Sequence, residues 1–90
     1  PFNIASTALL VHILAKMTGL LPGKVILVVG DAHIYKNHIK QVQLQLQRKP
    51  YIPCNLIVNI KRNKIEEYVA SDFVLQNYHS HSSIKADMVA

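Results

Sequence analysis

The chain has 90 residues, half of them hydrophobic, and a formal net charge of +5 from ten Lys and Arg against five Asp and Glu. This composition excludes a disordered protein, and the length allows one domain at most. The single Cys excludes an intrachain disulfide, and no secretory signal is visible, so we expect a cytoplasmic protein.

The apolar residues come in solid runs, which is more core than 90 residues usually enclose. We therefore expect a segment of a larger protein or half of an obligate dimer. The positive charge is compatible with nucleic acid, an acidic membrane surface or an anionic small substrate. The lysines are scattered, however, with one mild cluster at residues 61–64. Scattered lysines are typical of a solvated surface.

The first predicted element is a helix that Asn3 or Ser6 can cap and that ends near Thr18, just before Gly19. Its apolar residues cover nearly the whole circumference, which predicts a central helix packed on more than one side. Polar residues interrupt it, and it falls short of the ~20 apolar residues that a bilayer requires. A buried helix is favoured over a membrane span. Residues 24–29 then predict a strand that is apolar on both faces and interior to a sheet.

The apolar residues at 37–47 fit both the spacing of a helix and that of a strand. Ile39, Val42 and Leu46 fit helical spacing, whereas a two-residue alternation in the same stretch fits a strand. Gln and Lys favour a helix and Asn37 is placed to cap it, so we predict a helix.

The second half of the chain predicts two more strands. Pro50 and Pro53 end the helical stretch, and residues 55–61 favour a strand. Asn63 and Glu66 resemble a capping box for a helical turn at residues 65–68. Residues 72–78 then predict another strand, followed by a polar tail.

Most of the potential ligand-binding groups lie in the motif GDAHIYKNH at residues 30–38. Asp31, His33 and Tyr35 would alternate onto one face of an extended segment. That face presents an anion, an imidazole and a phenol to one small polar molecule. From spacing alone, the motif predicts the polar wall of a pocket in an α/β protein.

The sequence gives little support for a nucleophilic cysteine, a metal site or a phosphate-binding loop. Cys54 has no spacing signature of a nucleophile, and packing is the usual role of a free Cys. The histidines, among them His33 and His38, lack the further Cys or Glu ligands of a tetrahedral zinc site, so we expect no metal. No phosphate-binding or nucleophile-elbow motif is present.

Two stretches together carry a resemblance. PFNIAS at residues 1–6, followed by GDAHIYKNH, closely resembles the thymidylate synthase family, and the continuation agrees as far as the Ile84-Lys85 pair. The resemblance covers essentially all of the chain. It implies that residues 1–90 are a single segment from the C-terminal third of a thymidylate synthase domain. The implied fold is α/β of the α+β type, with a buried central helix packed on a mixed β-sheet.

The resemblance implies the reductive methylation of dUMP to dTMP by 5,10-methylenetetrahydrofolate, which is both carbon donor and reductant. Asn3 would match the residue that hydrogen-bonds the uracil ring, since an amide offers both a donor and an acceptor. His33 and Tyr35 would match the pair that holds the deoxyribose 3'-hydroxyl. Asp31 would orient neighbouring groups rather than touch the ligand.

The folate co-substrate would meet the two ends of the chain. Phe2 would lie against its ring system, and Met88, Val89 and Ala90 would match the tail that closes over it and excludes water. The full-length enzyme would be a homodimer, and no metal is implied.

The chain also departs from the family pattern. Thr7 stands where a tyrosine is usual, Lys49 replaces a glutamate after an arginine, and Ser80 and Ser82 replace prolines. The nucleophilic cysteine and the phosphate-binding arginines should precede residue 1, and Cys54 does not align with that nucleophile. We therefore expect the isolated chain to be inactive.

Three alternatives remain open at this point. A deoxycytidylate hydroxymethylase relative is expected to carry aspartate at the position of Asn3, so Asn3 favours uracil. A truncated relative could act as an RNA-binding or dimer-forming module, with the cluster at residues 61–64 contributing charge. An unrelated α/β domain with chance motif matches is the third. No membrane partner is expected.

Overall fold

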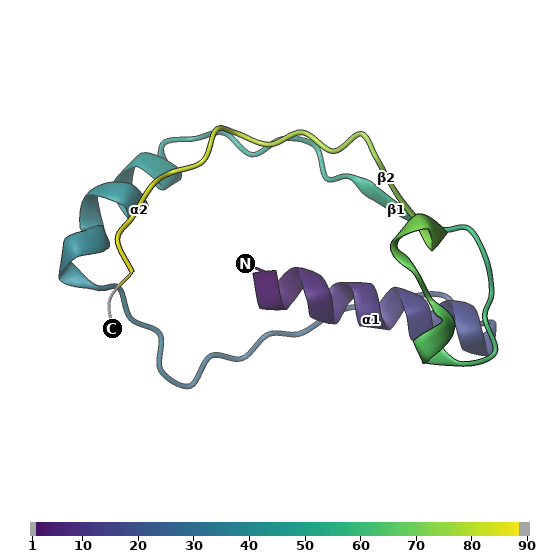
Figure 1. The fold of residues 1–90 in the computed structure, drawn as a ribbon. Helices are drawn as coiled ribbons and strands as arrows, with labels where there is room; N and C mark the ends of the chain where they lie inside the picture. The colour runs from purple at the N-terminus through teal and green to yellow at the C-terminus, as the bar shows by residue number, and fades with distance from the viewer. Residues whose placement is uncertain (1, 89–90) are drawn as a thin grey trace.

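The computed structural model describes residues 2–88, which form two α-helices, one two-stranded sheet and short 3₁₀ turns. In chain order the elements are α1 (Phe2–Thr18), η1 (Lys36–His38), α2 (Ile39–Leu46), β1 (Asn55–Val58), η2 (Ile65–Glu67), η3 (Ala70–Asp72) and β2 (Phe73–Gln76). The chain follows an open curve, with α1 and the strands toward one end, α2 at the other, and extended segments between them (Figure 1). The predicted α+β class is confirmed.

α1 ends where the sequence predicts. Gly19 adopts a positive φ of 72°, a conformation that glycine takes without steric cost. The Leu20 N–H donates to the Ala15 carbonyl at 2.9 Å, which is the six-to-one bond of a Schellman motif. The Thr18 hydroxyl donates to the Leu14 carbonyl at 2.8 Å.

The start of α1 differs from the prediction. The helix already includes Phe2, so Asn3 and Ser6 lie inside it. The Ser6 and Thr7 hydroxyls donate to the Asn3 carbonyl at 3.0 and 2.9 Å. The predicted caps are therefore wrong, because hydroxyls inside a helix bond back to the preceding turn.

α1 is only partly covered by the rest of residues 2–88. Ile13 and Ala15 are the buried residues of the helix, and α1 contacts β1. Leu10 and Leu14, by contrast, remain 42% and 46% exposed. The helix was predicted to pack on more than one side, and within this part of the chain that packing is incomplete, because a helix that is apolar over most of its surface needs neighbours on several sides. None of the described helices is both long and apolar enough to cross a bilayer.

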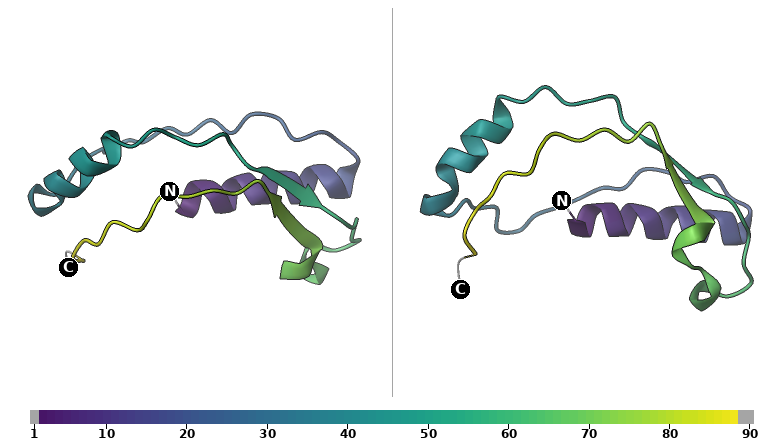
Figure 2. Two further views of the ribbon diagram at one scale, coloured as in Figure 1. Left: turned by 90° about the horizontal axis from the view of Figure 1, so that it is seen from above. Right: turned by 45° about the horizontal axis from the view of Figure 1, so that its top comes forward.

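The predicted strand at residues 24–29 is not formed. The backbone there is extended in Figures 1 and 2, but no other described segment pairs with it. The apolar side chains point into water, with Ile26 84% and Val28 85% exposed. A strand is defined by its hydrogen bonds to a neighbouring strand. The apolar composition of residues 24–29 therefore predicted the extended backbone correctly, but not the pairing.

Residues 39–46 form α2, which confirms the helical period over the alternating one. The predicted Asn37 cap is wrong, because Asn37 lies inside η1 and neither η1 nor α2 has a side-chain cap bond. The helix instead begins through the 3₁₀ turn, in which the His38 N–H donates to the Tyr35 carbonyl at 2.9 Å.

β1 and β2 pair antiparallel, with Asn55 opposite Gln76 and Val58 opposite Phe73. Both strands were predicted, and both are shorter than predicted; Asn77 ends β2 with a φ of 57°. Within residues 2–88 the sheet is antiparallel rather than mixed, since residues 24–29 do not join it.

A partly buried ion pair holds the connection between β1 and β2. Arg62 donates from Nε to Asp72 Oδ2 at 3.1 Å and from Nη2 to Asp72 Oδ1 at 2.9 Å, and the Val69 N–H donates to Oδ2 at 3.0 Å. The Arg62 bonds first, and the Val69 bond second, hold the pKa of Asp72 below its ordinary value. The same carboxylate raises the pKa of Arg62.

The helical turn predicted at residues 65–68 forms as η2, although its predicted capping box does not. Lys64, rather than Asn63, precedes the turn, and no side chain caps it. The Arg62 N–H donates to the Tyr68 hydroxyl at 3.2 Å and ties the turn back to the Arg62 segment.

Candidate functional site

Asp31, His33 and Tyr35, which we call the polar row, lie on one side of an extended backbone. His33 Nδ1 lies 3.5 Å from Asp31 Oδ1, and the His33 and Tyr35 rings meet edge to face with centroids 5.4 Å apart. The predicted alternation is confirmed, because alternate residues share one face. The predicted pocket wall is not formed by residues 2–88: the His33 and Asp31 side chains are 56% and 90% exposed, and Tyr35 is 49% exposed.

His38 extends the polar row, and sequence reasoning missed this. Its ring is perpendicular to that of Tyr35 at a centroid distance of 5.7 Å, and its N–H donates to the Tyr35 carbonyl. The sequence placed His38 in the ligand-rich motif at residues 30–38 and considered it with His33 as a metal ligand, but did not pair it with Tyr35; no three His, Cys, Asp or Glu side chains in residues 2–88 are placed to hold a metal ion. The sequence could have indicated this contact, because His38 follows Tyr35 by three residues and one 3₁₀ turn brings such residues to the same side.

Residues 81–87 run along α2 in the opposite direction. At one end Arg48 Nη1 donates to the Ser82 carbonyl at 2.7 Å. At the other end His38 Nε2 donates to the Asp87 carbonyl, also at 2.7 Å. Both bonds use backbone oxygens of the tail, so they fix its path whatever side chains it carries.

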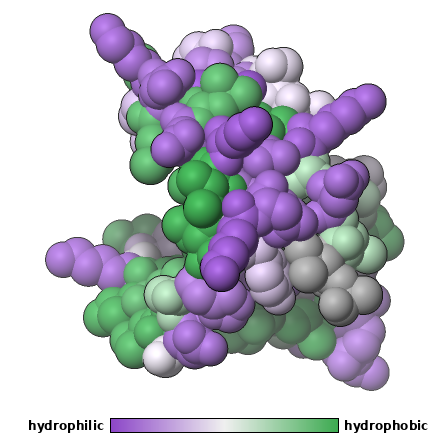
Figure 3. Space-filling view, turned by 90° about the vertical axis from the view of Figure 1, so that its left-hand side faces the viewer, coloured by the Kyte–Doolittle hydropathy of each residue, from purple (hydrophilic) through white to green (hydrophobic). Residues whose placement is uncertain are grey.

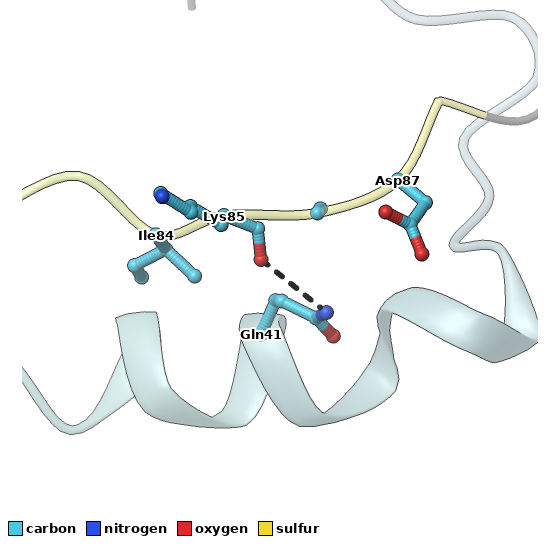
Figure 4. A pocket seen from close by; sticks show the side chains of 5 residues that line it. Gln41, Ile84, Lys85 and Asp87 are labelled. Atoms are coloured by element: carbon cyan, nitrogen blue, oxygen red, sulfur yellow. Dashed lines mark hydrogen bonds between the residues drawn. The ribbon is translucent and has the colours of Figure 1, made fainter.

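Figure 4 shows the middle of this contact. Gln41 Nε2 reaches the Lys85 carbonyl at 3.5 Å, a long bond, and Ile84 lies over the same helix. An open cavity of about 450 Å³ lies between Gln41 and residues 84–87, and Gln41 Oε1 is buried without a hydrogen-bond partner among residues 2–88. Figure 3 views the end of the molecule that holds α2, where hydrophilic side chains project between apolar ones. The tail thus lies on α2 through polar contacts more than through apolar packing.

An aromatic cluster holds the start of the tail. The Tyr51 ring is 4.6 Å from that of His81 at a tilt of 31°, and 6.1 Å from that of His79. His81 Nε2 also donates to the Lys49 carbonyl at 2.8 Å. These contacts attach the tail to the segment that follows α2.

The other predicted site residues lie apart from the polar row. Asn3 is exposed in the first turn of α1, and within residues 2–88 no hydrogen bond joins its side chain to the row. Figure 1 shows the N-terminal end of α1 pointing toward the end that holds α2. Phe2 and Met88 are 84% and 98% exposed. Val89 and Ala90 lie outside the described residues.

Comparison with known proteins identifies the family. The family profile described as thymidylate synthase matches residues 1–90. The chain belongs to the thymidylate synthase family. It is 48% identical over 88 residues to the thymidylate synthase of Homo sapiens, 48% over 86 residues to that of Buchnera aphidicola, and 44% over 88 residues to that of Equine herpesvirus 2.

These matches cover nearly the whole chain but a minor part of each relative. They include 98%, 96% and 98% of the chain, and 28%, 33% and 30% of the respective thymidylate synthases. The chain therefore spans about a third of the length of these relatives.

Two of the four departures from the thymidylate synthase pattern make hydrogen bonds in the contact between α2 and the tail. The Lys49 carbonyl accepts from His81, and the Ser82 carbonyl accepts from Arg48. Backbone atoms accept both bonds, so the departures are compatible with a docked tail. Thr7, a third departure, uses its hydroxyl only within α1.

Proposed function

We propose that this chain is part of a thymidylate synthase that converts dUMP to dTMP, with 5,10-methylenetetrahydrofolate as carbon donor and reductant. The family match over residues 1–90 carries the proposal, and the intact polar row supports it. In this proposal the chain is one segment from the C-terminal third of a cytoplasmic, homodimeric synthase. The single Cys fits a reducing compartment. The comparisons lend no support to the RNA-binding alternative.

The polar row is chemically suited to a sugar hydroxyl. An imidazole and a phenol can each donate or accept a hydrogen bond, so His33 and Tyr35 can hold both the proton and a lone pair of the 3'-hydroxyl. Their edge-to-face contact, with 82° between the ring planes, fixes one ring relative to the other. The Asp31 carboxylate attracts the Nδ1 proton of His33, which leaves Nε2 to accept from the sugar.

The remaining contacts come from the ends of the chain. We assign the uracil ring to Asn3, whose amide meets O4 and the N3–H together. We assign the folate to Phe2, whose exposed ring offers a stacking surface, and to the closing tail of Met88, Val89 and Ala90. A closed tail excludes water from the reacting groups.

This chain alone does not supply the nucleophile in our proposal. Cys54 is half-buried and directly precedes β1 rather than lying beside the polar row. Attack on C6 of the pyrimidine therefore falls to a cysteine elsewhere in the synthase, and the isolated 90 residues should form no dTMP from dUMP and the folate.

An Asn3→Asp substitution in the full-length synthase tests the proposal. The original protein should turn over dUMP, and Asn3→Asp should reduce this about tenfold or more while allowing dCMP to bind, because cytosine offers an amino group and an unprotonated N3. Asn3→Ala is the control and should weaken both nucleotides. The measurements are dTMP and dihydrofolate formation and the Kd of each nucleotide.

Two results would contradict this assignment. A preference of the unsubstituted protein for dCMP would indicate a hydroxymethylase. Salt-dependent RNA binding that survives Asn3→Ala and His33→Ala, in a protein without dUMP turnover, would indicate a non-catalytic module.

A further inference from the structure

The contact between α2 and the tail contains a cavity that the proposed function does not use. It has a volume of about 450 Å³ and is lined by Gln41 and residues 84–87. A cavity of this size can hold a small organic molecule. Within residues 2–88, none of the side chains assigned above to dUMP or to folate lines it.

Gln41 gives this cavity an acceptor without a donor. Its Nε2 donates to the Lys85 carbonyl at 3.5 Å, and its Oε1 is buried without a hydrogen-bond partner among residues 2–88. Exchanging the two amide atoms would not help, because Oε1 would then face the Lys85 carbonyl, which is itself an acceptor. Buried polar atoms are nearly always hydrogen-bonded, since an unmade bond is destabilising. A donor from outside the described residues therefore has to reach this oxygen.

Lys85 and Asp87 add two further acceptors. Figure 4 shows the Asp87 carboxylate directed from the tail toward α2, and the Lys85 carbonyl turned toward Gln41. The 3.5 Å bond from Gln41 is at the limit of a hydrogen bond, so the Lys85 carbonyl has capacity for a second donor. The Lys85 ammonium lies beside Ile84, away from Asp87 (Figure 4). The polar atoms beside Gln41 are therefore acceptors.

We propose that this cavity binds a small aliphatic amine in its protonated form, with the ammonium group between Gln41 and Asp87 and the carbon chain toward Ile84. An ammonium group carries three donors and no acceptor, which matches the three acceptors of the cavity. The Asp87 carboxylate supplies the opposite charge, and charge-assisted hydrogen bonds are the stronger ones. An alcohol of the same length offers one donor and a carboxylate offers none, so neither fits as well.

The positive charge of the chain opposes an ammonium ligand only weakly. The net charge is +5, but exposed charges more than about 10 Å apart are largely screened at 0.1 M salt. The groups that contact the ligand therefore decide its charge, and among them the side chain directed at α2 is the Asp87 carboxylate.

Three substitutions in the full-length synthase test these contacts. Gln41→Leu removes the acceptor, Gln41→Glu replaces it with a carboxylate, and Asp87→Asn removes the charge while keeping the shape of the side chain. Gln43→Glu is the matched control for Gln41→Glu. Gln43 lies in the same helix, is exposed and does not line the cavity, so its substitution adds an equal charge elsewhere on α2.

Propylamine is the probe, and 1-propanol and propionate are the neutral and anionic controls. Each Kd is measured at neutral pH by NMR, following the backbone amide signals of residues 84–87 and, where present, the Gln41 side-chain amide. We expect propylamine to bind with a Kd in the millimolar range, since so small a ligand makes few contacts. Gln41→Leu and Asp87→Asn should each weaken it about five- to tenfold. Gln41→Glu should tighten it about threefold or more, and Gln43→Glu should stay within about twofold.

Binding of propylamine no tighter in Gln41→Glu than in Gln43→Glu would overturn the inference, even if Gln41→Leu does not fold. Equal affinity for 1-propanol and propylamine would do the same. Absence of propylamine binding up to about 100 mM would also overturn it, and would indicate that another segment of the synthase supplies the donor to Gln41. The proposed function is tested separately, because dTMP formation from dUMP depends on none of these results.

Discussion

The two ends of the molecule are held by different kinds of interaction. At one end the β1–β2 hairpin has paired backbones and the bidentate Arg62–Asp72 contact, whose partners are ten residues apart. At the other end single hydrogen bonds attach the tail to α2 and its flanking residues; they join His38 to Asp87, Gln41 to Lys85, Arg48 to Ser82 and His81 to Lys49, which are 49, 44, 34 and 32 residues apart.

This difference indicates which end is free to respond to ligands. Closing a longer loop costs more entropy, and an exposed hydrogen bond contributes little net stability. The tail contact should therefore open at a lower free energy than the hairpin. A segment that closes over a ligand must first be able to open, and the proposed folate site uses the end of the molecule that opens more easily.

The largest effect is expected from Asp72→Ala, which removes the acceptor of Arg62 and of the Val69 N–H. We expect hydrogen exchange of residues 55–58 and 73–76 to accelerate strongly, because the partly buried Arg62 guanidinium and the Val69 N–H lose their shared acceptor. Asp87→Ala is the control, since Asp87 acts on α2 through its carbonyl. Unchanged hydrogen exchange of the hairpin in Asp72→Ala would show that the Arg62–Asp72 contact does not stabilise this end of the molecule.

Acid should weaken the hairpin end through the same carboxylate. The folded state lowers the pKa of Asp72, so its stabilising effect is full above its unfolded-state pKa of about 3.9 and is lost as the pH falls through the lower folded value. Hairpin exchange measured from about pH 6 to about pH 2 should show this loss, and Asp72→Asn should flatten the profile. Weakening that begins well above pH 5 would point to another group.

Arg48→Met, which has no hydrogen-bond donor, should loosen the tail while leaving the hairpin unchanged. It removes one exposed, charge-assisted bond to the Ser82 carbonyl, so we expect a loss of about 1 kcal/mol in tail docking, or about fivefold in its equilibrium. Arg48→Lys keeps a donor and should retain part of the effect. Hydrogen exchange of residues 80–88 measures the change. Equal acceleration at the hairpin would show that the two ends are not independent.

The smallest effect is expected from Asp31→Asn. The Asp31 carboxylate is 90% exposed and 3.5 Å from His33 Nδ1, and exposed pairs of this kind contribute about 0.2–1 kcal/mol. The Kd of dUMP, measured by calorimetry with the full-length synthase, should rise less than about fivefold. A larger loss would place Asp31 in contact with the ligand.

Local patterns predicted the local elements well. Gly19 marked the end of α1, helix-forming residues decided α2, and β-favouring residues at 55–61 predicted the first strand of the hairpin. Each of these depends on residues within a few positions of one another. The motif at residues 30–38 likewise predicted the polar row, because alternation is a property of the extended chain itself.

The remaining features depend on partners that local pattern does not specify. Residues 24–29 have the composition of an interior strand, yet a strand needs a neighbour, and none of the described segments pairs with it. The course of the tail along α2 rests on four single hydrogen bonds between distant residues, which the periodicity of the sequence does not predict. For the same reason the hydrogen bond between His38 and the Asp87 carbonyl was not predicted.

The central claim, that the polar row holds the 3'-hydroxyl of dUMP, is tested most directly with Tyr35→Phe and two ligands. The full-length synthase and this variant are each titrated with dUMP and with its 3'-deoxy analogue. We predict that Tyr35→Phe weakens dUMP about five- to tenfold but leaves the affinity for the analogue unchanged, because the hydroxyl that Tyr35 contacts is absent from it. An equal loss of affinity for both ligands would contradict the account.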